Sequence, residues 1–168
     1  MDILSWLPHL KRLALINLPL WSTAGWSNIE PILPTSLECF AAGPEHAILV
    51  DGACYPSLKW FCSVDTVLTD AEFNVLISMP NLRDFHWCFI NERMGLECVR
   101  GLANILKSRT WNSVCLYVID GAEMRLEERE ELEIELTNLY EDKRVKRYQM
   151  VNVEDWSFAL FSHWTRIG

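Results

Sequence analysis

The chain has 168 residues, a formal net charge of −8 at pH 7 and 50% hydrophobic residues. This length suits one domain, and the apolar share excludes a disordered segment. The acidic balance argues against a nucleic-acid-binding protein, which needs a basic surface to displace counterions. No apolar run reaches the roughly 20 residues that span a bilayer, so a membrane is not expected as a partner either.

The six cysteines form no C-x-x-C pair, and four of them fall inside predicted strands. This usage favours free thiols in a reducing compartment, the cytoplasm or the nucleus, over a disulfide scaffold. The apolar stretch after Lys11 and Arg12 superficially resembles a secretion signal. The acidic Asp2 and the interrupting Pro19 make secretion the less favoured interpretation.

One apolar pattern, L-x-x-L-x-L, organises the chain. It first reads Leu10-x-x-Leu13-x-Leu15, and looser copies begin at residues 37, 58, 82, 111 and 145. Strands are predicted inside these copies, near residues 13–16, 38–41, 59–63, 82–87, 114–119 and 147–153. A strand signature that recurs every 20 to 35 residues or so is typical of a solenoid of strand-plus-helix units.

The segments between the strands are predicted to be turns or helices. A helical turn is expected within 22–33, and 43–57 holds either an additional edge strand or a loop. The run Thr69-Asp70-Ala71-Glu72 predicts a capping box at the start of a helix. Phe73, Leu76 and Ile77 then share one helical face, and Pro80 ends the helix.

Three more helices are expected toward the C-terminus, over 92–107, 122–142 and 154–166. The apolar stripe of the first is Val99, Leu102, Ala103 and Leu106. Gly95 and Gly101 each weaken that helix by about 1 kcal/mol relative to alanine, so tertiary packing must hold it. The 122–142 helix has an acidic outer face with basic residues after its C-terminus, where the helix dipole favours them. The 154–166 helix is expected to cover the end of the stack.

The repeats and their openings, Leu7-Pro8-His9-Leu10-Lys11 and Met79-Pro80-Asn81-Leu82-Arg83, resemble leucine-rich-repeat proteins. The irregular spacing is most similar to the repeat region of fungal F-box/leucine-rich-repeat proteins. The resemblance implies one α/β domain over 1–168, an irregular solenoid of about six short parallel strands with helices on the outer face.

In that family the repeats select a target for a ubiquitin ligase, while an N-terminal F-box docks the ligase scaffold. No segment of this chain resembles an F-box, so a ligase scaffold is expected as a partner only if an F-box lies upstream. A solenoid normally covers its first repeat with a polar cap, and none is visible here. We therefore expect the N-terminal end to self-associate.

Alternation along each strand places every second side chain on the concave face of such a solenoid. That face is predicted to be poor in charge and to hold aromatic residues, a composition typical of protein-recognition surfaces. The candidate partner-binding residues are Arg12, Trp60, Cys62, Asp84, His86, Tyr117 and Arg147. The alternative is that the helices or residues 43–57 cover this face, which leaves a structural fragment with no activity of its own.

Cys62, His86 and Cys115 would lie on successive strands, and such residues are common zinc ligands. No fourth ligand is evident, so neither a metal nor a cofactor is predicted. The chain also has no nucleophile elbow, no phosphate-binding glycine loop and no metalloprotease helix. We therefore predict no catalytic residues and a non-catalytic module that binds a protein or peptide. An enzyme whose site no motif encodes is a third, weaker alternative.

Overall fold

The computed structural model describes residues 7–16, 29, 33–90, 96–108, 110–119 and 126–150. Within these residues the chain has an α/β fold, with one six-stranded sheet and three α-helices. The strands are β1 (Arg12–Ile16), β2 (Cys39–Gly43), β3 (Trp60–Val64), β4 (Asp84–Ile90), β5 (Ser113–Ile119) and β6 (Val145–Met150). The helices are α2 (Asp70–Ser78), α3 (Leu96–Ser108) and α4 (Leu126–Tyr140), with a short 3-10 turn, η3 (Gly52–Cys54).

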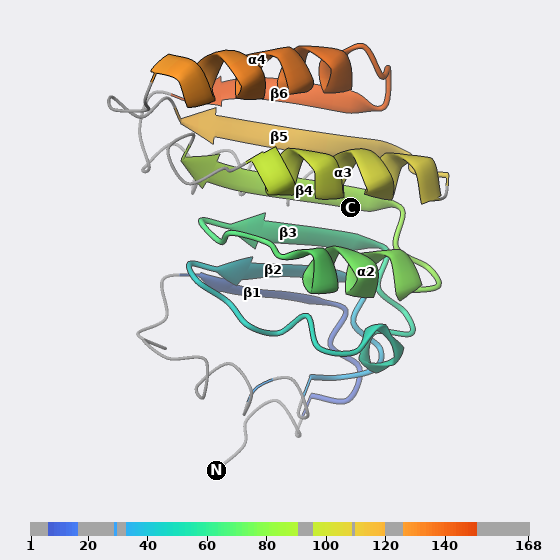
Figure 1. Ribbon diagram of the computed structural model, residues 1–168. Coiled ribbons are helices and arrows are strands. Elements are labelled where there is room, and N and C mark those ends of the chain that lie inside the picture. Colours follow the sequence, from blue (N-terminus) through green and yellow to red (C-terminus); the bar gives the residue numbers. More distant parts are fainter. Residues whose placement is uncertain are drawn as a thin grey trace.

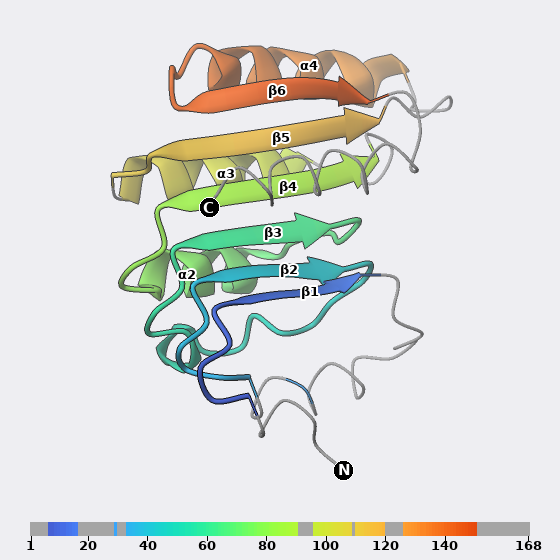
Figure 2. The same ribbon diagram turned by 180° about the vertical axis from the view of Figure 1, so that it is seen from behind.

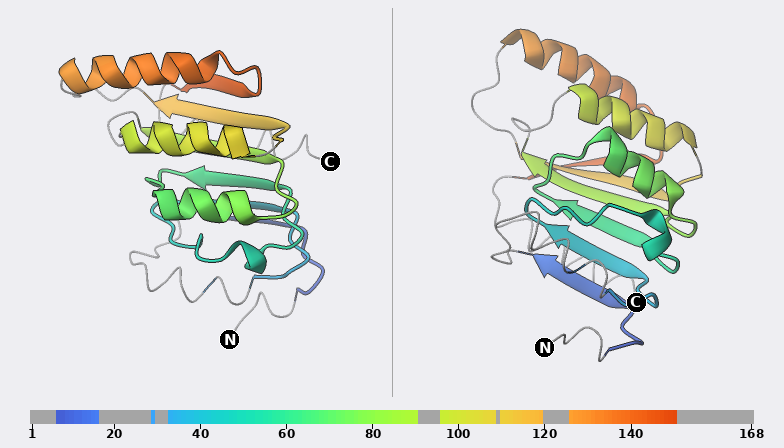
Figure 3. Two further views of the ribbon diagram at one scale, coloured as in Figure 1. Left: turned by 45° about the vertical axis from the view of Figure 1, so that its right-hand side comes forward. Right: turned by 60° about the horizontal axis from the view of Figure 1, so that its bottom comes forward.

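All six strands are parallel, and their order in the sheet follows their order in the sequence (Figure 1). The helices α2, α3 and α4 lie side by side on one face of this sheet, as Figure 3 shows from two further directions. Figure 2 shows the strands from the opposite side. Because α2, α3 and α4 each return the chain over the same face, β4, β5 and β6 are added one after another at the same edge of the sheet.

The predicted alignment of the first five strands is confirmed. Leu13 pairs with Phe40, Phe40 with Phe61, Phe61 with Phe85, and Phe85 with Val114. These positions form one row of apolar side chains across five strands. A parallel row like this fixes the two faces of the sheet, because successive side chains of a strand point to opposite faces.

The predicted alignment of β6 is wrong. The sequence pattern placed Tyr148 opposite Val114, but the structure pairs Val114 with Val145 and Tyr117 with Tyr148. The difference is three residues, and an odd shift exchanges the two faces of a strand. Arg147, predicted on the concave face, therefore lies on the helix side. Its guanidinium carbon is 5.3 Å from the centre of the Tyr140 ring of α4.

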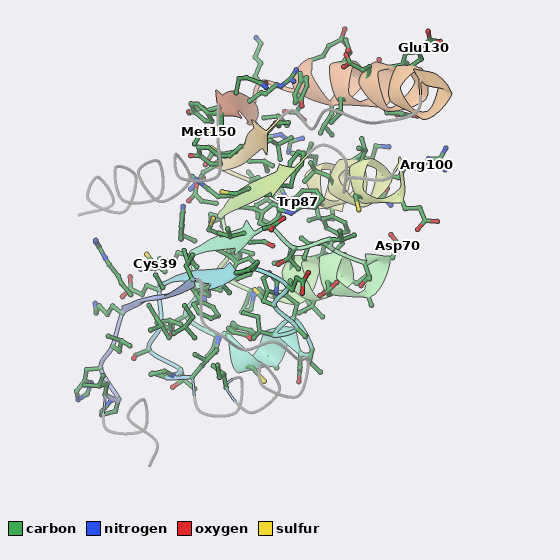
Figure 4. The ribbon with its side chains drawn as sticks, turned by 90° about the vertical axis from the view of Figure 1, so that its left-hand side faces the viewer. Cys39, Asp70, Trp87, Arg100, Glu130 and Met150 are labelled. Carbon is green, nitrogen blue, oxygen red and sulfur yellow. The ribbon has the colours of Figure 1, made fainter. Side chains whose placement is uncertain are left out.

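The main hydrophobic core lies between the sheet and the helices. Among its almost fully buried side chains the largest is Trp87, which contacts the rings of Phe85, Phe89 and Phe73 and donates a hydrogen bond from Nε1 to the Thr66 carbonyl at 3.0 Å. Figure 4 views the sheet from its side, with Trp87 toward the helices and Cys39 and Met150 toward the other face. Asp70, Arg100 and Glu130 lie on the outer surface of the helices in the same view.

The start of α2 is confirmed as a capping box. The Thr69 hydroxyl accepts from the Glu72 amide at 3.4 Å, and the Glu72 carboxylate accepts from the Thr69 amide at 2.8 Å. Phe73 and Leu76 are buried, as the predicted apolar face requires. The helix ends before Pro80, in agreement with the prediction.

The predicted apolar stripe of α3 is buried at Val99, Leu102 and Leu106, while Ala103 is partly buried. Gly101 faces α2, and a β-carbon there would overlap the ring of Phe73. The glycine thus allows the two helices to approach closely, which explains its place within a helix. In α4, Leu136 and Leu139 are buried against the same core.

Apart from Gly43, which ends β2, residues 43–57 form no strand, which decides between the two predicted alternatives in favour of a loop. Ile48, Leu49 and Tyr55 of this loop are buried in the helix-side core, and the Tyr55 hydroxyl donates to the Ile48 carbonyl at 2.6 Å. Gly43 has a positive φ of 149°, and a β-carbon there would collide with the backbone of Val64.

The predicted helix at 154–166 and nearly all of the predicted turn at 22–33 lie outside the described residues. No helix within the described ranges is long and apolar enough to cross a bilayer. All six cysteines are free thiols, and Cys54 is exposed whereas the other five are buried.

Candidate binding site

The sheet has a second face, turned away from α2, α3 and α4, which we call the helix-distal face. It corresponds to the predicted concave face. Its side chains, assigned from the strand register, are those of Arg12, Ala14, Ile16, Cys39, Ala41, Trp60, Cys62, Val64, Asp84, His86, Cys88, Ser113, Cys115, Tyr117, Lys146, Tyr148 and Met150.

The centre of the helix-distal face is a second, smaller hydrophobic core. Trp60 is 4% exposed, Cys62 is fully buried and Tyr117 is 2% exposed. The helices and the 43–57 loop do not produce this burial, because they pack on the opposite face. The alternative that the helices or residues 43–57 cover this face is therefore wrong, although the centre of the face is buried.

Four rings follow one another across the helix-distal face from β3 to β6, diagonally as far as Tyr117 and then directly across to Tyr148. The ring centres of Trp60 and His86 are 4.9 Å apart, those of His86 and Tyr117 are 5.8 Å apart, and Tyr117 stacks on Tyr148 at 4.9 Å. The Tyr117 hydroxyl also lies 3.4 Å from Nδ1 of His86. Tyr148, at the β6 end, is the most exposed of the four rings at 36%.

A cavity of about 630 Å³ lies on this face where the strands begin. We call it the strand-start pocket, because its lining residues lie at or near the first residues of the strands; the blunt ends of the arrows in Figure 2 mark where the strands begin. Its lining comes from all six strands and the residues just before them: Lys11, Arg12, Glu38, Cys39, Lys59, Trp60, Asp84, His86, Ser113, Cys115, Lys146 and Tyr148.

Glu38 joins two lysines at one end of the strand-start pocket. Its carboxylate lies 2.9 Å from the ammonium of Lys11 and 2.6 Å from that of Lys59. Hydrogen bonds from Lys59 and then Lys11 lower the pKa of Glu38 to about 2. The lysine side chains nevertheless stay 70% and 62% exposed. One carboxylate therefore positions two cations that still face solvent.

Asp84 occupies the other part of the pocket wall. Its carboxylate accepts a hydrogen bond from the Ser113 hydroxyl at 2.7 Å and a longer one from the Asn112 amide at 3.4 Å. Both carboxylates of the lining are thus engaged within the protein. The lining holds four cationic side chains and two anionic ones, which leaves an excess of two positive charges on a chain whose net charge is −8.

The thiols of the helix-distal face have low chemical reactivity. The sulfur atoms of Cys62 and Cys88 are 3.9 Å apart. Burial raises the pKa of Cys62 well above its usual value and raises the pKa of Cys115 to about 11. Thiols in this state are protonated at neutral pH and are poor nucleophiles and poor metal ligands. No three His, Cys, Asp or Glu residues in the described part of the chain are placed to hold a metal ion.

One histidine–serine pair lies on the helix side of the sheet. Nε2 of His46 is 2.8 Å from the Ser63 hydroxyl, and the His46 amide donates to the Thr66 hydroxyl at 3.2 Å. Both side chains are buried, and burial lowers the pKa of His46 to about 3. A substrate could not reach this pair, so we interpret it as a hydrogen-bonded part of the core that fixes the 43–57 loop.

The seven predicted site residues separate into three groups. Arg12, Trp60, Asp84 and His86 line the strand-start pocket. Cys62 and Tyr117 lie in the buried centre of the same face and do not line the pocket, whereas Trp60 belongs to both the buried centre and the pocket. Arg147 lies on the opposite face, beside α4.

Several pocket residues were not among those predicted. They include Lys11, Glu38, Lys59, Lys146 and Tyr148. The first three carried a usable signal, because each directly follows the first apolar residue of a repeat, at residues 10, 37 and 58. The last two were missed because β6 was placed in the wrong register.

Comparison of the chain with known protein families, with curated proteins and with solved structures gave no match.

Proposed function

We propose that the chain is a non-catalytic protein-recognition module that binds a segment of a partner protein in the strand-start pocket. The observation that carries this proposal is the cavity of about 630 Å³, to which all six strands contribute side chains. Pockets of about 300–1,000 Å³ are the usual size for ligand binding, and this volume suits a few side chains of a peptide.

The composition of the pocket supports recognition of a protein. Trp60, Tyr148 and Arg12 are of the three residue types that most often dominate binding energy at protein interfaces. Polar and charged side chains surround the aromatic ones, as in an interface with an apolar centre and a polar rim. The one hydroxyl of the lining that meets a carboxylate is that of Ser113, which donates to Asp84 at 2.7 Å; we interpret this bond as a support of the pocket wall, so the proposal is binding and not catalysis.

The fold supports the finer proposal that the chain is an irregular leucine-rich-repeat solenoid. Its strands follow one another in sequence order, all are parallel, and the helices lie on one face only. This arrangement leaves one face of the strands available for binding, as in other solenoids. By resemblance, we propose that the bound partner is a target that a ubiquitin ligase receives from this module.

A second candidate function is a structural unit whose helix-distal face packs inside a larger protein. The burial of Trp60, Cys62 and Tyr117 favours it. The two proposals differ at the strand-start pocket, since a purely structural unit needs no exposed charged rim there.

Tyr148 is the residue that tests the recognition proposal, because it lines the pocket while remaining 36% exposed. Partners captured from a cell extract by the wild-type chain should be purified and titrated against Tyr148→Ala. Ile134→Ala on α4 is the matched control, since Ile134 is an exposed apolar residue outside the pocket.

We expect Tyr148→Ala to weaken binding by about tenfold or more, as for an aromatic hot spot, while it melts only about 2–4 °C below the wild type. Ile134→Ala should bind normally. Equal affinity of all three proteins would refute recognition at the pocket. A ligase scaffold among the captured proteins would support the ubiquitin-ligase part of the proposal, and its absence from repeated captures would count against that part alone.

A further inference from the structure

We infer that the strand-start pocket binds an acidic peptide segment, with carboxylates that reach both ends of the pocket. This inference rests on the proposed function and adds the chemistry of the partner. The observations behind it are the charge of the lining, the position of each cation, and the distance that the lining spans.

The first step is the local charge. Lys11, Arg12, Lys59 and Lys146 outnumber Glu38 and Asp84 in the pocket by four to two. The chain as a whole has the opposite sign, with a net charge of −8. A positive pocket on an acidic protein favours an acidic ligand at that place and disfavours it elsewhere, because complementary potential improves both specificity and the association rate.

The second step is that the acidic residues of the pocket are already engaged. Glu38 lies between Lys11 and Lys59, and Asp84 accepts from Ser113 and Asn112. Each lysine ammonium has three N–H donors. The contact to Glu38 uses only part of that capacity, and both lysine side chains remain mostly exposed. A carboxylate from a partner can therefore bind these ammonium groups without displacing Glu38.

The third step is the spacing of the cations. Lys11 and Arg12 lie at the start of β1, Lys59 directly precedes β3, and Lys146 lies in β6. Neighbouring strands are about 4.8 Å apart, so β1 and β6 are separated by about 24 Å. An extended peptide that rises about 3.4 Å per residue covers this distance with about seven residues. The geometry thus fits acidic residues near both ends of a short extended segment.

The same lining fits a nucleic acid less well. A cationic groove with aromatic rings is the usual site for single-stranded nucleic acid. Here, however, Glu38 and Asp84 lie among the cations and would repel a continuous phosphate backbone. The acidic chain would repel the flanking phosphates as well. A peptide can avoid both carboxylates, because its charges are separated by neutral residues.

The probe for this inference is a fluorescein-labelled heptapeptide with two glutamates at each end and three neutral residues between them. Its counterparts carry glutamine or lysine in place of glutamate, with the same length and label. Fluorescence polarisation should show binding of the glutamate peptide only. We expect its affinity to fall as salt is added, because the contacts at the rim are exposed and are screened at ionic strengths near 0.1 M, where the Debye length is about 10 Å.

Lys146→Glu tests the site itself, because Lys146 is exposed and lines the pocket. Arg100→Glu is the matched control, since it changes the net charge equally from the outer surface of α3 (Figure 4). We expect Lys146→Glu to weaken binding of the glutamate peptide by about threefold to tenfold, the range for reversing one exposed ion pair. Arg100→Glu should bind normally, and Lys146→Arg should retain binding.

The inference is overturned if the glutamine peptide binds as tightly as the glutamate peptide, or if Arg100→Glu and Lys146→Glu weaken binding equally. In those cases the proposed function survives as long as a captured partner still depends on Tyr148. Failure of every peptide to bind also overturns it. The inference is also overturned if a short single-stranded oligonucleotide or inorganic phosphate displaces the labelled glutamate peptide more strongly than the same peptide without label does. Self-association that disappears in Lys146→Glu would identify a second copy as the occupant and would also overturn it.

Discussion

The ring of Phe73 in α2 occupies the space that a β-carbon on Gly101 in α3 would need. Phe73 is buried and has its ring against Trp87, with ring centres 5.8 Å apart, so it has little freedom to move away. The contact between these two residues therefore sets how closely the two helices approach over the centre of the sheet.

We predict that Gly101→Ala lowers the free energy of unfolding. Overpacking a core lowers the stability by about 1–3 kcal/mol, and the higher helix propensity of alanine offsets about 1 kcal/mol of that loss. The net loss is measured by chemical denaturation. Phe73→Leu provides the control, since a smaller side chain makes room for the methyl group. The double variant should lose less stability than the sum of the two single changes, and strict additivity would contradict the contact.

Stability should fall between pH 6.5 and pH 5 because of His46. Burial lowers the pKa of His46 to about 3 in the folded chain, whereas an unfolded histidine has a pKa of about 6.5. The unfolded state therefore binds a proton first as the pH falls, and this favours unfolding. Proton linkage therefore lowers the free energy of unfolding by about 2 kcal/mol at pH 5, relative to its full value above pH 6.5.

The measurement is a set of denaturant curves at several pH values for the wild type and for His46→Asn. The variant should have lower stability at neutral pH but a smaller slope in this window. The window lies above the unfolded pKa values of aspartate and glutamate, about 3.9 and 4.3, so Glu38 and Asp142 contribute little to it. Identical slopes would show that His46 titrates normally.

Two stacked tyrosines should respond differently to truncation. Tyr117 is 2% exposed and Tyr148 is 36% exposed, although their rings lie only 4.9 Å apart. Tyr117→Ala should cost about 3–5 kcal/mol of stability, the range for large buried aromatic residues. Tyr148→Ala should cost about 1 kcal/mol, the value of an aromatic pair at the surface. Thermal melting distinguishes them, and equal losses would mean that the face is either open or covered throughout.

A single thiol of the native chain should react quickly with a thiol-specific reagent such as Ellman's reagent. Cys54 is exposed, and the other five cysteines are buried. Burial also raises the pKa of Cys39, Cys62 and Cys115, which reduces the fraction present as reactive thiolate. Cys54→Ser should remove the fast phase, while denaturant should expose the remaining thiols. A fast phase of two or more thiols would contradict this burial.

The apolar pattern was sufficient to predict the first five strands and their alignment. Leu13, Phe40, Phe61, Phe85 and Val114 all fall at the same place in their repeats, and the structure brings them into one row. A slip of one residue would turn these side chains away from the helices, so a buried face specifies the register strongly.

The sixth strand lacked that constraint. Its sequence, Val145 to Met150, places Val, Arg and Gln on one face and Lys, Tyr and Met on the other, so neither of the two faces is apolar throughout. The preceding turn sets its register. The Arg144 amide donates to the Asp142 carboxylate at 2.9 Å, and the Val145 amide donates to the Asp142 carbonyl at 2.8 Å. This turn places Val145 opposite Val114. Hydrogen bonds of this kind cannot be predicted from the pattern of apolar residues.

The pocket was predictable only in part, for a similar reason. Trp60 and His86 follow from strand alternation, but Lys11 and Lys59 lie just before their strands, where alternation does not apply. Their position depends on the ion pairs to Glu38, which join three consecutive repeats. Contacts of this kind depend on the finished sheet, and the sequence indicates them only as a charged residue recurring after the first apolar position.

Along the strands, the residues that face the helices form the main core, and the alternate residues form the second core or line the pocket. In β3, Phe61 belongs to the interior that holds the fold together, while its neighbour Trp60 belongs to the pocket. Ligand preference can therefore diverge through changes at the exposed pocket positions, such as Lys59 and Tyr148, while the helix-side residues that form the main core stay the same. A chain built in this way can acquire a new binding partner without a new architecture.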